Sequence, residues 1–167
     1  RHPHEGRDWR LSLESGQHQF AAILGCADSR ACPDLLFDQG FGDLFVVRVA
    51  GNVVDVDVTA SLEYAVDHLN TKLIVVLGHS NCGAVTATLD HLAESASEPE
   101  EIVSLLYRIE PSLDGLPDNL PRKDLIRLAV ESNVKFAVRR LTQFPDVRKN
   151  MKRRNLRIIG AVYDMHT

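Results

Sequence analysis

The sequence predicts an α/β fold, a single domain in which helices flank a mainly parallel central β-sheet. Three observations predict it. Short runs of branched and aliphatic residues are apolar on both alternating faces, which is typical of strands buried on both sides. Longer segments between them carry apolar residues at three- and four-residue spacing, as amphipathic helices do. Strand and helix alternate along the chain, and this order favours right-handed crossover connections.

The elements follow in chain order. Strands are expected at 20–25, 44–49, 72–78 and 156–162, and helices at 57–69 and 124–141. The acidic segment 94–101 and the segment 111–121, rich in Pro, Asp and Gly, are expected to be surface connections. Neither has the character of a linker, so residues 1–167 are interpreted as one domain.

Composition excludes several classes of protein. The 167 residues suit one domain, and a content of 44% hydrophobic and 25% charged residues excludes collagen-like, mucin-like and broadly disordered chains. A net charge of −4 argues against nucleic-acid binding, and no run approaches the roughly 20 apolar residues of a membrane span. An odd, low number of cysteines predicts reduced thiols in a cytoplasmic setting. The chain opens at Arg1, so its natural N-terminus is not visible, and export or fusion to a membrane protein stays open.

Two expected strands end in residues that carry chemistry. The first is followed by C-A-D-S-R at 26–30, and the third by H-S-N-C-G at 79–83. In an open parallel sheet, functional groups gather beyond the carboxyl ends of the strands, where the strand order reverses. If the first strand lies between the second and the third, the two motifs emerge side by side.

These motifs supply a zinc-ligand set. Cys26, His79 and Cys82 offer two thiolates and an imidazole, and Cys82 lies at the expected start of a helix, which favours the thiolate. Three protein ligands with an exchangeable fourth are typical of a catalytic site, whereas four fixed ligands are typical of a structural one. Asp28 is the candidate for the fourth position and Arg30 is its candidate partner. We therefore expect a switch in which Asp28 either binds the metal or turns to Arg30.

At these residues the chain resembles the β-class carbonic anhydrases, whose signatures appear as CADSR at 26–30 and GHSNCG at 78–83. The similarity continues through 37–52, 61–69, 129–134 and 158–164. The resemblance implies a zinc enzyme that hydrates carbon dioxide reversibly to bicarbonate and a proton, by attack of a zinc-bound hydroxide. It also implies that Asp28 and Arg30 form a dyad that gates and orients the fourth zinc position, Asp28 being a ligand only in the closed state.

The resemblance assigns further residues. Gln17 is similar to a glutamine that contacts substrate across a dimer, Phe45 and Tyr64 to residues that line the apolar substrate pocket, and the N–H of Gly83 to a contact at the site. A homo-oligomer, either dimer or tetramer, is implied. From the resemblance we also expect that residues 1–167 lack the extreme N- and C-terminal segments of the family. It also departs from the family pattern at 31–34, where it reads A-C-P-D, and at Ile23, where a tryptophan marks members with an inhibitory bicarbonate site.

Two other functions are compatible with these residues. One is hydrolysis of carbonyl sulfide or carbon disulfide on the same scaffold. The other is a weakly active zinc-binding regulatory domain of a larger protein, such as a bicarbonate transporter. Outside the motifs, Arg48 is expected to pair with a buried carboxylate, Cys32 to be a half-buried thiol, and Trp9 to anchor local packing.

Overall fold

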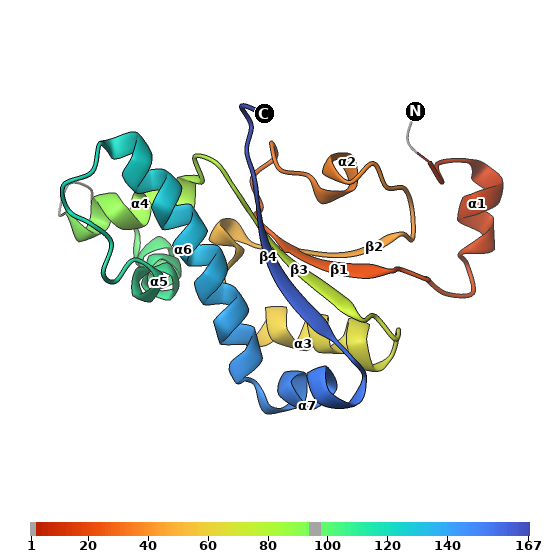
Figure 1. The fold of residues 1–167 in the computed structure, drawn as a ribbon. Coiled ribbons are helices and arrows are strands. Elements are labelled where there is room, and N and C mark those ends of the chain that lie inside the picture. The colour runs from red at the N-terminus through yellow and green to blue at the C-terminus, as the bar shows by residue number, and fades with distance from the viewer. Residues whose placement is uncertain (1–2, 94–97) are drawn as a thin grey trace.

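The computed structural model describes residues 3–93 and 98–167 and has the expected α/β architecture (Figure 1). Four parallel strands form one sheet in the order β2-β1-β3-β4. The strands are β1 (Ala21–Gly25), β2 (Leu44–Arg48), β3 (Leu73–His79) and β4 (Arg157–Tyr163). The first strand thus lies between the second and the third, which was the condition for bringing the two motifs together.

Helices connect the strands. They are α1 (Arg7–Ser12), α2 (Pro33–Leu36), α3 (Val56–Asp67), α4 (Gly83–Leu92), α5 (Glu100–Ile109), α6 (Arg122–Gln143) and α7 (Pro145–Arg153), with short 3₁₀ turns η1 (Ala50–Asn52) and η2 (Glu110–Ser112). The helices expected at 57–69 and 124–141 are confirmed as α3 and α6. Asp55 begins α3 because its side chain accepts a hydrogen bond from the N–H of Val58. Pro145 cannot continue α6 and instead starts α7.

The connection expected at 94–101 is only partly described. Residues 94–97 lie outside the described residues, and α5 already begins at Glu100. The last two residues of that segment are therefore helical. Two acidic side chains in the first turn favour a helix start here, because they complement its dipole.

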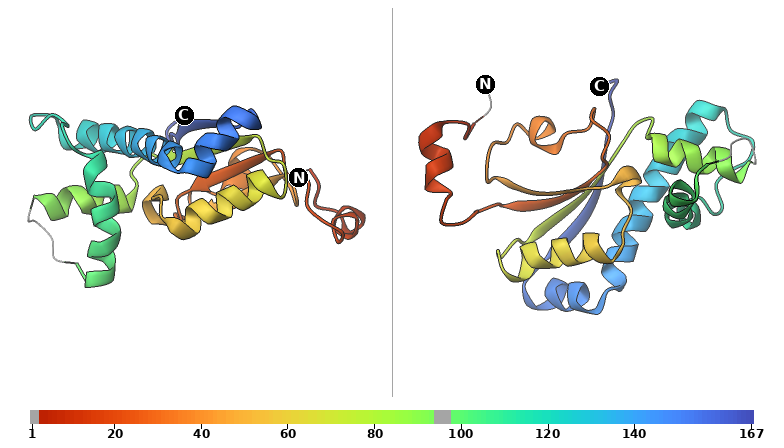
Figure 2. Two further views of the ribbon diagram at one scale, coloured as in Figure 1. Left: turned by 90° about the horizontal axis from the view of Figure 1, so that it is seen from below. Right: turned by 180° about the vertical axis from the view of Figure 1, so that it is seen from behind.

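The two faces of the sheet are covered unequally. Residues of β1 and β3 on one face pack with apolar residues of α3, α6 and α7 in the main core, and Figure 2 shows these helices on that face. On the other face a smaller cluster is completed by Leu36 of α2 and by residues of β2 and β4. A third cluster, formed by α4, α5 and α6 beyond the carboxyl ends of the strands, contains Cys26 and Cys82.

The expectation that every strand is buried on both faces is wrong for β2 and β4. All residues of β1 are buried, whereas those of β2 are half-buried or exposed, and Ile159 of β4 is 47% exposed. The physical reason is position: among the residues that the structure describes, β2 and β4 each have a strand on one side only. Apolar composition therefore identified these segments as strands but not as central ones.

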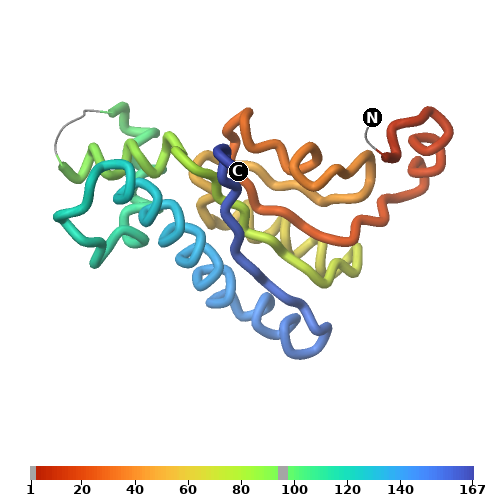
Figure 3. The backbone as a smooth tube through the Cα atoms, turned by 45° about the horizontal axis from the view of Figure 1, so that its top comes forward, coloured from red at the N-terminus to blue at the C-terminus, as the bar shows by residue number. Residues whose placement is uncertain are grey.

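The N-terminal helix α1 stands apart from the sheet (Figure 3). It buries no residue. It is attached through Trp9, whose indole N–H donates to the carbonyl of Phe41 at 2.8 Å and whose ring stacks on His4. Trp9 is 37% exposed, so it is a local anchor, as expected, without being part of the core. No described helix has the length and apolar character needed to cross a membrane.

Candidate metal centre

The predicted ligand residues meet at the carboxyl ends of β1 and β3. Cys26 directly follows β1, His79 ends β3, and Cys82 is the residue before the first turn of α4. The three donor atoms lie within 4.8 Å of one another. All three residues are buried, with exposed fractions of 4%, 0% and 2%. The fold therefore brings together residues that are far apart in the sequence.

The imidazole of His79 is oriented for metal binding. Its Nδ1 lies 3.0 Å from the carbonyl oxygen of Ser80, so Nδ1 carries the proton and donates it there. This leaves Nε2 as the basic nitrogen, and Nε2 is buried without a hydrogen-bond partner among the described residues. A buried, unpartnered nitrogen held in this way is typical of a metal ligand with a backbone carbonyl behind it.

The sulfur atoms also fit zinc. Two thiolates bound to one tetrahedral zinc at about 2.3 Å each lie about 3.8 Å apart. The Sγ atoms of Cys26 and Cys82 are 3.9 Å apart. Two soft thiolates and an imidazole are a preferred donor set for zinc.

Electrostatics within the group favour anionic sulfur at Cys26. Hydrogen bonding to Cys82 holds the pKa of Cys26 well below its usual value, although burial opposes this. The same contact, together with burial, raises the pKa of Cys82. Burial lowers the pKa of His79, but the neighbouring Cys26 outweighs it and the net shift is upward. One negative charge is therefore already stabilised among the three side chains.

Asp28 and Arg30 form the expected pair beside this group. Arg30 donates from Nε to Oδ1 at 2.9 Å, from Nη2 to Oδ2 at 2.7 Å, and from its backbone N–H to Oδ1 at 3.0 Å. These bonds to Arg30 hold the pKa of Asp28 well below its usual range. Oδ2 of Asp28 is 3.7 Å from Nε2 of His79. The carboxylate is thus ionised, held by Arg30, and adjacent to the donor group.

Among the residues that the structure describes, Arg48 pairs with no buried carboxylate, so that expectation is wrong. Its Nε donates to the carbonyl of Cys26 at 2.9 Å and its Nη2 to that of Asp28 at 2.6 Å. The exposed end of β2 lies beside the end of β1, where Arg48 aligns with Gly25. Arg48 therefore fastens the loop that carries one predicted ligand and one member of the pair. Cys32 is half-buried, as expected.

Sequence reasoning missed two residues next to the group. The N–H of Gly51 donates to Sγ of Cys26 at 3.3 Å, and the side chain of Asn133 donates to the carbonyl of Gly51 at 2.8 Å. A signal for Asn133 was present: it lies on the face of α6 whose other buried residues are apolar. A lone amide on an apolar helix face needs a specific partner.

Three residues assigned by resemblance lie away from the group. Phe45 aligns with Ala22, four residues before Cys26, or about 13 Å along the strand direction. Gln17 precedes β1 and is exposed, and Tyr64 lies eight residues into α3, which leads back toward the start of β3. Only Gly83, the first residue of α4, is next to a ligand residue. One chain therefore does not bring the other three to the metal group.

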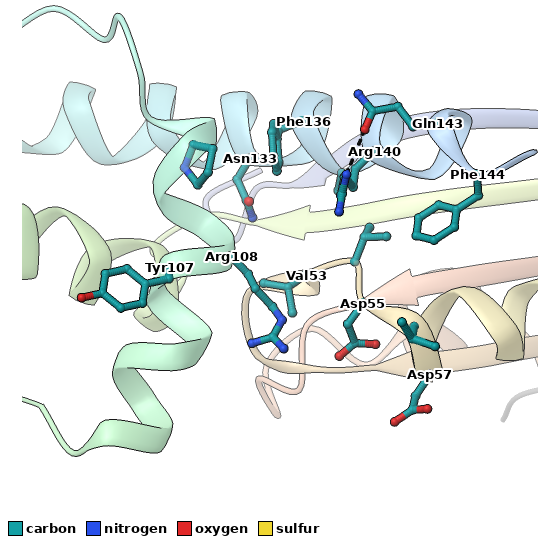
Figure 4. Close-up of a pocket in the computed structure, with 14 residues that line it drawn as sticks. Val53, Asp55, Asp57, Tyr107, Arg108, Asn133, Phe136, Arg140, Gln143 and Phe144 are labelled. Atoms are coloured by element: carbon teal, nitrogen blue, oxygen red, sulfur yellow. Dashed lines mark hydrogen bonds between the residues drawn. The ribbon is translucent and has the colours of Figure 1, made fainter.

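A cleft of about 690 Å³ lies elsewhere, between the start of α3, α5 and α6 (Figure 4). Figure 4 shows Arg108 and Arg140 on its walls, with Asn133 between the two helices. Asn133 and Val53 are among the residues that line the cleft, and the three predicted ligands are not.

A parallel α/β domain with a buried Cys₂His group and a carboxylate–guanidinium pair beside it defines a zinc-site metalloprotein. The family model described as carbonic anhydrase matches residues 21–167. The chain therefore belongs to the β-carbonic anhydrase family, whose cofactor is zinc, and its own donor set fits that metal.

Relatives and solved structures agree with this family assignment. Carbonic anhydrase 2 of Mycobacterium tuberculosis is 48% identical over 124 residues, which cover 74% of this chain and 60% of that protein. The structure of the β-carbonic anhydrase CcaA has a TM-score of 0.88 at 31% identity, covering 96% of this chain and 75% of that one. A tetrameric β-carbonic anhydrase from Sordaria macrospora has a TM-score of 0.85 at 28% identity, covering 98% and 84%. The chain thus spans about 60% of the length of the mycobacterial relative.

Proposed function

We propose that this chain catalyses the reversible hydration of carbon dioxide to bicarbonate and a proton. The observation that carries the proposal is the position of Asp28, which Arg30 holds with Oδ2 3.7 Å from Nε2 of His79. A structural zinc site needs no ionised carboxylate held beside its ligands. A catalytic site that must orient a reacting water does.

Cys26, His79 and Cys82 would hold the zinc. When bound, zinc would supply a Lewis acid that brings the pKa of water from 15.7 to about 7. The role of Asp28 is to accept a hydrogen bond from the reacting water. This bond orients a lone pair of the water oxygen toward carbon dioxide. Arg30 keeps that carboxylate ionised and in place. Holding it in position lowers the entropic cost of reaching the transition state. Bicarbonate then leaves in exchange for water, and the proton leaves through solvent or buffer.

The same pair is proposed as a gate. Oδ2 of Asp28 lies 3.7 Å from Nε2 of His79, and the contacts of the carboxylate with Arg30 oppose its movement toward the donor group. In the closed state Asp28 would be the fourth ligand and no water could react. Arg48 supports the open state because it fixes the carbonyl of Asp28 independently of the carboxylate.

We further propose that the active site is shared between two chains, in a dimer or tetramer. Gln17, Phe45 and Tyr64 lie toward the amino ends of the strands, and the metal group lies at the carboxyl ends. Tyr64 is 51% exposed, so this surface is available to a second copy. If the three residues serve the reaction, they serve the metal group of a partner. The tetrameric relative from Sordaria macrospora is consistent with such an assembly.

Mixing two damaged chains tests the shared site. Arg30→Ala removes a residue beside the metal group, and Tyr64→Ala removes one from the opposite end. In a statistical mixture of dimers half are mixed, and each mixed dimer holds one undamaged site, so activity should recover to about a quarter of the wild-type value. An activity equal to the mean of the two pure variants would contradict sharing.

Substrate choice is tested on zinc-quantified protein. Stopped-flow hydration kinetics from about pH 6.5 to about pH 9 should show a rate that rises with pH. A parallel assay for sulfide release from carbonyl sulfide and carbon disulfide addresses the alternative hydrolase. No hydration by fully loaded protein would favour the regulatory-domain alternative.

The three free thiols also support the proposal that the protein works in a reducing, cytoplasmic compartment.

A further inference from the structure

Asn133 is a buried amide on an otherwise apolar helix face. It is 2% exposed, and the other buried residues of α6 are all apolar: Ala129, Val130, Val134, Ala137 and Leu141. A buried polar group is costly unless it makes a hydrogen bond. The contact that this amide makes therefore accounts for its presence there.

The partner of Asn133 is backbone that touches the metal group. Nδ2 donates to the carbonyl of Gly51 at 2.8 Å. Gly51 has a φ of 65°, and a Cβ at this position would come within 2.6 Å of Cδ1 of Ile109, so this turn favours glycine. The N–H of the same residue donates to Sγ of Cys26 at 3.3 Å. Three elements, α6, η1 and the end of β1, are thus joined in one line of contacts.

We infer that Asn133 is a positioning residue for the metal site. By holding the carbonyl of Gly51, it keeps the N–H of Gly51 aimed at the sulfur of Cys26. A hydrogen bond to a thiolate withdraws electron density from it, so the sulfur donates less charge to a bound metal. Groups behind the ligands tune a metal site in this way, and their loss commonly changes metal affinity or activity by 10–100-fold.

The location of Asn133 suggests an alternative role, in which its side chain only fills space or stabilises α6. Its side chain lines the cleft of Figure 4, so a smaller residue would open that cleft toward Gly51. If Asn133 only fills space or only stabilises α6, truncation will lower the melting temperature without changing the sulfur. If it positions Gly51, truncation will change the electronic state of the thiolate.

The test uses Asn133→Ala. In the cobalt-substituted protein, the thiolate-to-cobalt charge-transfer band should move to lower energy, because a sulfur without its hydrogen bond gives up charge more easily. In metal-free and zinc-loaded protein, amide exchange at Gly51 should accelerate at least tenfold. If Asn133→Ala does not fold, Asn133→Ser is measured instead. The serine side chain is one bond shorter than that of asparagine, so its hydroxyl does not reach the Gly51 carbonyl.

Asn150→Ala is the matched control. Asn150 is also buried, 6% exposed, and donates from Nδ2 to Asp67 at 3.0 Å on the far side of the domain. This variant should lose stability but leave the cobalt band and Gly51 exchange at wild-type values. A wild-type band and wild-type exchange in the Asn133 variant would overturn the inference. Equal changes in both variants would also overturn it.

Discussion

The two ends of the sheet differ in how complete they are. At the carboxyl ends of the strands, the Cys₂His group is buried to 4% exposure or less, and backbone and side-chain donors hold its surroundings. At the amino ends, Phe20 is 58% exposed, Tyr64 is 51% exposed, and α1 buries nothing. One chain therefore builds its metal group fully, whereas its opposite end is a surface that lacks the contacts to be a site by itself. Under the proposed shared site, the chemistry is local to one chain while substrate binding requires two.

The largest expected effect comes from removing a ligand at the carboxyl end. Cys82→Ser should reduce zinc content to less than about a tenth per chain and lower the melting temperature, because metal binding and folding are coupled. Metal analysis and thermal unfolding measure both. Cys32→Ser is the control, because this half-buried thiol lies outside the group and its loss should leave zinc content near one per chain. Full zinc occupancy in Cys82→Ser would refute the ligand assignment.

A smaller effect at the same end separates catalysis from metal binding. Arg30→Ala should reduce hydration roughly 10²-fold while zinc content stays near one per chain, because the freed Asp28 takes the fourth position. A metal-edge absorption spectrum identifies that ligand. Arg127→Ala, which breaks an exposed ion pair with Glu131 on α6, is the control and should leave the hydration rate and zinc content unchanged. Wild-type hydration with water as fourth ligand in the Arg30 variant would mean that no gate exists.

The opposite end should respond differently. Tyr64→Ala should lower kcat/KM about tenfold without loss of zinc, and the melting temperature should barely change because the side chain is half exposed. Kinetics and sedimentation together measure this. A stable, fully active wild-type monomer in sedimentation would contradict the shared site and remove the contrast between the two ends.

The smallest effect concerns charge near Tyr64. Burial, with Asp146 and Asp67 nearby, raises the pKa of Glu63. A carboxyl group whose pKa is higher folded than unfolded destabilises the protein once it is ionised, so stability falls as pH rises past about 4.5. Glu63→Gln should therefore raise the melting temperature at pH 7 by about 1–2 °C, and the gain should vanish near pH 4. A constant difference across that range would show that the effect is not ionisation.

Sequence patterns predicted the metal end better than the rest. The positions of Cys26 and His79 follow from strand ends, and strand ends follow from apolar runs closed by glycine. The contact between Arg30 and Asp28 follows from a spacing of two residues. Such contacts depend on local geometry, which a sequence pattern contains.

Contacts that depend on tertiary placement could not be predicted. Arg48 binds two backbone carbonyls, and a carbonyl has no signature in the sequence. The bond from Asn133 to Gly51 joins distant positions and requires a left-handed turn. The exposure of β2 and β4 depends on which strands are central, a property that their composition does not record.

The ligands also have a consequence for how the chain folds. Cys26 directly follows β1, His79 ends β3 and Cys82 lies just beyond it, so a metal that joins them closes a loop that includes β2 and α3. Closing such a loop restricts the unfolded chain much as a covalent cross-link does, and the entropy involved grows with the logarithm of loop length. The paired strands β1 and β3 are the long-range contact that a folding chain finds slowly. A metal held early by these residues would bring the two strands together before the sheet forms, so zinc should speed folding as well as stabilise its product.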